Sequence, residues 1–190
     1  MRQRNMIAIN EKYKKEVVPA MMKKFNYKSK MAVPIIEKVV VNVGFGKMIS
    51  GKTSDEERKI IKSISEGLTL ITGQHPVLTK SKKSIAGFKI RKGSPVGIMV
   101  TLRRKKMFDL LERLINIAIP RSRDFAGINP NSVDKKGNLT IAIKEHISFP
   151  EILPERAKMF FSLEITTVTS TQNREQGLEL LRLIGFPIKS

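Results

Sequence analysis

The segment from Gly46 to Thr53, GKMISGKT, contains residues whose types and spacing could bind the phosphates of a nucleotide. It fits the pattern G-x-x-x-x-G-K-[ST], in which backbone N–H groups cradle the phosphates while the lysine and hydroxyl contact phosphate and magnesium. The flanking sequence agrees, since the apolar IIEKVVVNV precedes it and the helix-like DEERKIIKSI follows. The segment therefore raises the hypothesis of a P-loop NTPase.

The rest of the sequence lacks what such an enzyme needs. A P-loop site also holds its magnesium through an acidic residue at the end of an apolar strand, and no apolar strand of four or more residues here ends in Asp. P-loop enzymes use parallel sheets with crossover connections, whereas this chain has the pattern of an antiparallel hairpin. NTP hydrolysis remains the alternative function, and binding of an RNA phosphate at this loop is the other interpretation.

Other catalytic or metal-binding groups are sparse. The chain has no cysteine, which excludes disulfides, thiolate catalysis and cysteine-ligated zinc. Its two histidines, His75 and His146, are far apart in sequence and lack metal-like spacing. We therefore expect no enzyme and no cofactor or metal.

Positive charge is the strongest compositional signal. The net charge is +19, of which residues 1–30 carry +7 and residues 67–108 carry +10 without a single Asp or Glu. An acid-free basic tract of this length predicts an anionic partner. The tract has the pattern of strands and turns rather than of a basic amphipathic helix, so nucleic acid is favoured and no membrane partner is expected. No run approaches the roughly 20 apolar residues of a membrane span.

Helices must position part of these residues, and capping and periodicity predict five of them. Asn10 is expected to cap the first helix and Pro19 to start the second. Ser54 and Glu57 form a capping box before a helix over 55–72, which Gly73 closes. An apolar stripe predicts a helix over 107–118 that Pro120 ends, and Thr171 is expected to cap the last helix.

Alternating apolar residues predict the strands. These are 36–43, 77–84, a hairpin with arms 86–91 and 96–104 around the turn 92–95, 139–143 and 162–170. Val39, Val41 and Val43 would share one face of the first strand, opposite Ile36 and Asn42. Strands and helices without regular alternation predict an α+β fold: a largely antiparallel sheet with helices packed on one face and a projecting basic β-hairpin. One domain over residues 1–190 is expected.

The outer face of this sheet combines cations with small polar groups: Lys38, Asn42, Lys89, Arg91, Thr101 and Arg103. The hairpin has only one aromatic residue, Phe88. Alternation along its strand places Phe88 on the same face as Ala86 and Ile90, so it should point inward, and a base-stacking ladder is not expected. The mixture suits backbone and sugar contacts to folded RNA, and no recognition helix or zipper indicates DNA. A general RNA chaperone without a fixed partner is a looser alternative.

Seven motifs extend over the chain in order: FNYKS, VPIIEKVVVNVGFG, LITGQHPVLTKSKKSIAGFKIRKGSPVG, VTLRR, IPRSRDFAGINPNSVDKKGN, ISFPEI and GFPIKS. With these motifs the chain resembles, from about Tyr13 to Lys189, the bacterial-type ribosomal large-subunit protein five family. The resemblance implies an antiparallel sheet with helices on one side. It also implies a structural role in the cytoplasm, on the ribosome, where the protein would hold 5S rRNA in the central protuberance of the large subunit.

The resemblance also implies site residues and partners. The 5S rRNA-binding set is Asn42, Gln74, Lys80, Lys82, Lys83, Thr101 and Arg103, and the hairpin tip with Lys89, Arg91 and Lys92 would contact P-site tRNA and a small-subunit head protein. Further implied partners are 23S-type rRNA and other proteins of the central protuberance. Members of the family vary just after VNVGFG, so the GKT of the P-loop pattern is a departure of this chain from the family.

Overall fold

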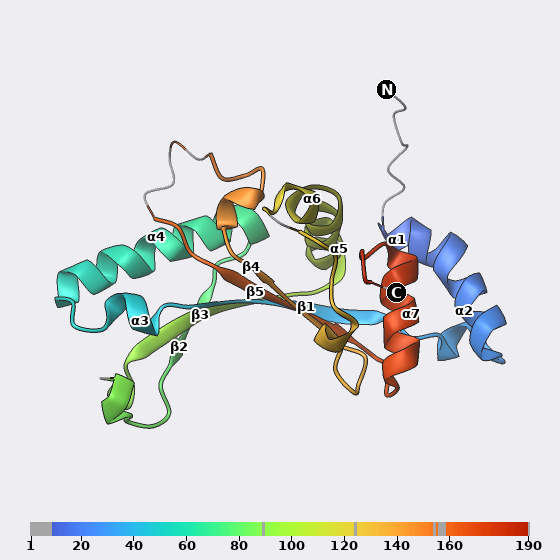
Figure 1. Ribbon diagram of the computed structural model, residues 1–190, viewed down its shortest axis with the longest axis horizontal. Coiled ribbons are helices and arrows are strands. Elements are labelled where there is room, and N and C mark those ends of the chain that lie inside the picture. The colour runs from blue at the N-terminus through green and yellow to red at the C-terminus, as the bar shows by residue number, and fades with distance from the viewer. Residues whose placement is uncertain (1–8, 89, 124, 154, 156–158, 190) are drawn as a thin grey trace.

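A five-stranded antiparallel sheet forms the centre of the molecule (Figure 1). The computed structural model describes residues 9–88, 90–123, 125–153, 155 and 159–189. The strand order is β2-β3-β1-β5-β4. The strands are β1 (Ile36–Gly44), β2 (Val77–Lys80), β3 (Pro95–Leu102), β4 (Leu139–Ile143) and β5 (Leu163–Thr169).

The central strand β1 separates a buried face from an open one. Val39, Val41 and Val43 are at most 1% exposed, and each lies opposite a buried residue of β3: Leu102, Val100 and Ile98. Side chains alternate between the two faces of a strand, so this result confirms the predicted valine face. The prediction for Ile36 was wrong, because the register with β5 shifts between Ile36 and Lys38 and the Ile36 side chain is buried.

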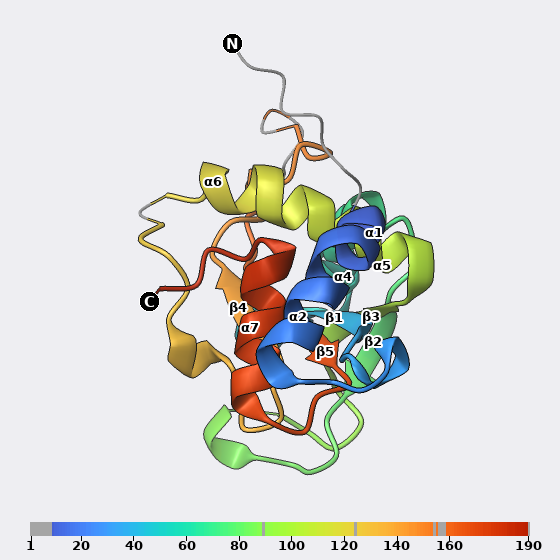
Figure 2. The same ribbon diagram turned by 90° about the vertical axis from the view of Figure 1, so that its right-hand side faces the viewer.

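Helices cover only one face of the sheet. α4 (Ser54–Thr72), α5 (Arg104–Arg113) and α6 (Ile119–Arg121) lie on this side, whereas α1 (Ile9–Lys12), α2 (Val18–Phe25) and α7 (Arg174–Ile184) gather at one end (Figures 1 and 2). The remaining helical pieces are η1 (Tyr13–Val17), η2 (Lys30–Ala32), α3 (Gly46–Ile49), η3 (Ala86–Phe88), η4 (Leu114–Ala118), η5 (Pro130–Ser132) and η6 (His146–Ser148). Among the described residues no α-helix crosses the other face, and the predicted α+β class is confirmed.

Helix ends differ from the prediction where side chains are used elsewhere. Thr53 and Glu56 form the capping box of α4, one residue before the predicted pair. Asn173 caps α7 by accepting the Glu175 backbone N–H, because the hydroxyl of the predicted cap, Thr171, donates to the Lys136 carbonyl oxygen. The π-helix η1 joins the first two helices into one helical segment. The predicted cap Asn10 lies inside this segment, because α1 begins at Ile9.

The prediction that residues 86–91 form the first arm of a hairpin was wrong. β2 pairs with β3, while residues 86–88 form the 3-10 turn η3 inside the connection between these strands. Two backbone bonds between Ile85 and Ile90, 2.9 and 3.2 Å long, close this connection at its tip. The tip is therefore a tight turn rather than a strand, and Phe88 is 61% exposed instead of facing inward.

α7 is placed by close contact between two glycines. A Cβ atom at Gly177 would lie 2.6 Å from the carbonyl oxygen of Gly137, in the turn that precedes β4. Gly137 has φ of +79°, a conformation that disfavours side chains. The last helix can therefore reach the sheet end only because both positions lack a side chain.

We predict that Gly177→Ala destabilises the protein by about 1–3 kcal/mol, because the added methyl group overlaps backbone that cannot rotate away. Urea denaturation followed by circular dichroism measures the change. Gly87→Ala is the control, since a Cβ there meets nothing within 4 Å, and its effect should stay below about 0.5 kcal/mol. Equal midpoints for the two variants would contradict the glycine contact.

His146 is a structural residue between α4 and the segment before β5. Its ring stacks on Phe161 with centroids 4.0 Å apart, and Phe161 in turn lies against Gly67 of α4. The side chain is almost fully buried, and its Nδ1 has no hydrogen-bond partner among the described residues. Burial lowers the pKa of His146, so the folded protein holds the neutral imidazole.

A lowered histidine pKa makes folding stability depend on pH. The unfolded chain takes up a proton near the usual value of about 6.5, so stability is fully present above that pH and declines as the pH falls from about 7 toward 5. His146→Phe, which retains the ring stacking, should flatten this decline in urea midpoints. His75→Gln changes an exposed histidine and should leave the decline intact; the same slope in all three proteins would show that His146 does not cause it.

Candidate nucleic-acid interface

The open face of the sheet presents small polar side chains in cross-strand rows. We use the term open face for the residues of these rows. The first row is Thr140, Thr166, Val40 and Thr101; the second is Ala142, Glu164, Asn42, Met99 and Val77; the third is Gly44, Gly97 and Thr79. The hydroxyls of Thr140 and Thr166 lie 3.1 Å apart. The face offers hydrogen-bond donors and acceptors and is suited to sugars, phosphates and base edges.

Three of the predicted site residues meet on this face or at its border. Asn42 and Thr101 are half-buried in neighbouring strands, and the Gln74 amide donates to the Thr101 carbonyl oxygen at 3.3 Å. β2 pairs with β3 only as far as Val77 opposite Met99, which leaves that carbonyl without a strand partner on this side. Gln74 therefore completes the sheet edge and fixes its own position beside Thr101.

Sequence reasoning missed Glu164, an acid on the open face. The Asn42 amide donates to the Glu164 carboxylate at 3.2 Å, which orients the amide across β1 and β5. Glu164 is far from Asn42 in sequence, and only the strand register brings the two together. The alternation of SLEITTVTS does place Glu164 on the same face as Thr166, which is the signal that could have indicated it.

Gly97 is buried within the open face by its neighbours. A Cβ atom there would lie 2.8 Å from the Thr79 hydroxyl and 3.0 Å from the Val43 carbonyl oxygen. Gly44 lies directly opposite Gly97 and also lacks a side chain. Glycine inside a strand often marks the close approach of another group, and here the Thr79 side chain and the neighbouring strand β1 already occupy the space that a side chain at Gly97 would need.

The connection between β2 and β3, residues 81–94, is the basic loop. Its backbone is tied by hydrogen bonds of 2.9 Å between Ser81 and Ser94 and between Gly93 and Ser81. Its exposed side chains include the cations Lys82, Lys83, Arg91 and Lys92 and the apolar Ile85 and Phe88. Lys89, the other predicted tip residue, lies outside the described residues. The described part of the basic loop thus presents exposed cations on a backbone that is fixed by hydrogen bonds.

Two groups of cations border the open face at its ends. Lys80 and the basic loop lie at one end of β3, and exposed Arg103 follows its other end. The eight residues of β3 correspond to about 26 Å at the usual rise of a strand. The structure therefore does not bring Arg103 together with the predicted lysines, and it places cations on both sides of the rows.

The P-loop pattern folds into a structure that cannot hold a nucleotide in the P-loop manner. Its residues 48, 49, 50 and 52 donate their backbone N–H groups to carbonyl oxygens at 2.8–3.2 Å. The backbone N–H and the hydroxyl of Thr53 both donate to the Glu56 carboxylate at 3.1 Å, and these bonds lower the pKa of Glu56. The groups that would cradle phosphates and magnesium are therefore occupied, and both neighbours of β1 are antiparallel.

Two further observations concern the described part of the chain. No helix there combines the length and apolar character that crossing a membrane requires. No cluster of three or more His, Asp or Glu side chains within the described ranges could hold a metal ion.

Comparisons with known proteins agree with the motif resemblance. Residues 29–91 match the family model described as Ribosomal protein L5, and residues 95–188 match the model for the C-terminus of the same ribosomal protein family.

Curated relatives match over nearly their whole length. Large ribosomal subunit protein uL5 of Geotalea daltonii is 48% identical over 185 residues, which cover 97% of this chain and 100% of the relative. The protein of the same name from Halothermothrix orenii is 48% identical over 182 residues, with 96% and 98% covered, and that from Dictyoglomus turgidum is 46% identical over 184 residues, with 97% and 99% covered. The chain therefore belongs to the uL5 family of ribosomal proteins.

Proposed function

We propose that this protein is a non-enzymatic, structural component of the large ribosomal subunit that binds 5S rRNA through the open face. Family membership supports the ribosomal role and with it a place in the cytoplasm, on the ribosome. One observation supports the open face as the RNA-binding surface: no α-helix of the described residues covers it, and cations border it at both ends.

The chemistry of the open face fits a folded RNA better than a single strand. The rows offer hydroxyl, amide and carboxylate groups, which can bond to 2′-hydroxyls and base edges in a wide, shallow minor groove. The rows contain no aromatic ring on which splayed bases could stack. Asn42 and Thr101 would read the RNA surface, while Gln74 would hold the edge beside them.

The cations supply the affinity that is independent of sequence. Lys80, Lys82 and Lys83 on one side and Arg103 on the other would contact phosphates on either side of the rows. The exposed acid Glu164 lies between them and pairs with Asn42. Its carboxylate can accept from a 2′-hydroxyl but repels phosphates, which favours an RNA placed with its sugars over the rows.

The basic loop extends away from the helix layer (Figure 1), and we propose that its tip serves other partners. Arg91 and Lys92 are exposed there, together with the apolar Phe88. A tip that combines cations with an exposed aromatic ring suits both the backbone of P-site tRNA and a protein of the small-subunit head, which would form an intersubunit bridge. 23S-type rRNA and other central-protuberance proteins are the remaining proposed partners.

Asn42→Ala and Thr101→Ala should each weaken 5S rRNA binding about five-fold, which corresponds to about 1 kcal/mol for one lost hydrogen bond. Binding to an unrelated structured RNA should change less than two-fold, because phosphate contacts remain. Filter binding at fixed salt measures both. Asn116→Ala, an exposed asparagine of η4 on the helix side, is the matched control. Equal losses on both RNAs would contradict the proposed contacts and favour a chaperone without a fixed partner.

The double variant Lys82→Ala/Lys83→Ala should weaken all RNAs alike and change the salt dependence. About five neutralised phosphates give a slope of log K against log salt near −4 to −5, and removal of two contacts should reduce its magnitude by about 2. Titrations between 50 and 300 mM salt measure the slope. An unchanged slope would exclude these lysines as phosphate contacts. Lys59→Ala/Lys62→Ala on α4 is the matched control.

A further inference from the structure

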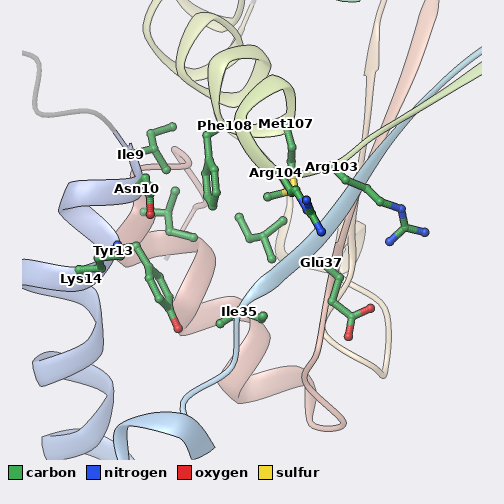
Figure 3. A pocket seen from close by; sticks show the side chains of 12 residues that line it. Ile9, Asn10, Tyr13, Lys14, Ile35, Glu37, Arg103, Arg104, Met107 and Phe108 are labelled. Atoms are coloured by element: carbon green, nitrogen blue, oxygen red, sulfur yellow. The ribbon is translucent and has the colours of Figure 1, made fainter. Parts of the chain in front are cut away.

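A cavity of about 590 Å³ lies between the N-terminal helical segment, the start of β1 and the start of α5 (Figure 3). Tyr13 and Phe108 contribute aromatic rings to it, while Glu37, Arg103 and Arg104 line its other side. We propose that this cavity receives an unstacked base of ribosomal RNA, an inference that rests on the proposed function. Its size lies within the range of about 300–1,000 Å³ in which small-molecule sites are found.

The two rings form an apolar part of the cavity lining. The Tyr13 hydroxyl donates to the Pro34 carbonyl oxygen at 3.0 Å, which holds its ring against the chain that leads into β1. Phe108 is partly buried and packs against the hydrophobic core from α5. Figure 3 shows both rings on the same side of the cavity. Base stacking on aromatic rings tolerates any base, so these rings provide affinity rather than sequence choice.

The other side of the cavity is charged and suits a nucleotide better than an apolar peptide. Arg103 and Arg104 are exposed cations that can reach the phosphates beside an inserted base. Among the described residues Glu37 is the single acid of the lining, and its carboxylate can accept from an amino or ring N–H group of an inserted base.

The backbone of Arg104 supports a functional position. It has φ of +54°, one of two such non-glycine residues in the described part of the chain. A left-handed backbone at a bulky residue stores strain, and strained residues cluster at ligand sites. Here the turn lets β3 change directly into α5 and places Arg104 at the cavity beside Met107 and Phe108 (Figure 3).

The cavity is continuous with the open face. Thr101 and Arg103 have the same parity at the end of β3, so their side chains leave the same side of the sheet about 7 Å apart. An RNA that covers Thr101 therefore passes Arg103 at the rim of the cavity. A base that leaves the stack at this point needs no second docking surface to enter.

Tryptophan fluorescence tests the inference, because the natural chain contains no tryptophan. Phe108→Trp places the reporter in the cavity, and Phe160→Trp places a control at an exposed position between β4 and β5 in the chain. Each variant is titrated with 5S rRNA, with large-subunit rRNA and with large-subunit proteins free of rRNA. We expect one of the RNAs to quench the cavity reporter at least twice as strongly as the control reporter. Quenching by the proteins alone, or none by either RNA, would overturn the inference.

An affinity measurement separates failure of this inference from failure of the proposed function. Phe108→Leu keeps apolar volume but removes the stacking surface, and should weaken binding of the quenching RNA about 10-fold, within the range for loss of one stacked base. Thermal melting checks that the variant is folded. If Asn42→Ala weakens binding while Phe108→Leu binds as the natural protein does, RNA binding by the open face is supported and base binding in the cavity is rejected. If the natural protein binds neither RNA, the proposed function itself fails.

Discussion

The alternation of side chains along β1 determines which residues of the sheet are buried and which lie on the open face. Val39, Val41 and Val43 contribute to the core, while Asn42, between them, lies on the opposite face. β1 pairs on both sides, with β3 and with β5, so its register orients the whole sheet. A slip by one residue would expose the valines and bury Asn42. The packing of the core therefore also keeps Asn42 on the proposed RNA surface, and no further interaction is needed to fix the strand register.

This alternation also explains where the charges lie. Inside the sheet, alternation and close strand spacing leave room for threonine, asparagine and glycine in the rows of the open face. Apart from Lys38 in β1, the cations around this face lie where strands end, at Lys80, in the basic loop and at Arg103. Most of the groups that can bind phosphates are therefore separated in space from the side chains of the rows. The arrangement suits an RNA whose backbone contacts both ends of the face while its groove lies over the rows.

Strong local periodicity made part of the fold predictable from sequence. The alternation of β1, β4 and β5 and the apolar stripe of α4 each extend far enough to indicate the element type. The stretch AGFKIR alternates in the same way, yet its residues 86–88 form a 3-10 turn, because backbone bonds between Ile85 and Ile90 close the chain locally. Positions of single caps also shifted, since hydroxyls such as that of Thr171 found tertiary partners.

The parts that sequence reasoning could not supply depend on contacts between distant segments. Glu164 meets Asn42 only through the register of β1 and β5, and the cavity beside Phe108 requires three segments to converge. The P-loop pattern failed for a different reason. The residue types and their spacing match the pattern, but the segment does not have the structure of a phosphate-binding loop. Its amides are bonded within one helical turn and its threonine caps α4, so residue types alone did not reveal whether those groups were free.

Oxidation of methionine in the complex tests directly whether RNA covers the open face. Met99 lies on this face beside Asn42 and is 37% exposed, whereas Met159 is partly buried near α4 on the helix side. Hydroxyl-radical footprinting read by mass spectrometry compares the two residues with and without saturating 5S rRNA. We predict that RNA protects Met99 several-fold and leaves Met159 unchanged. A Met99 that remains as reactive in the complex as in the free protein would contradict the account.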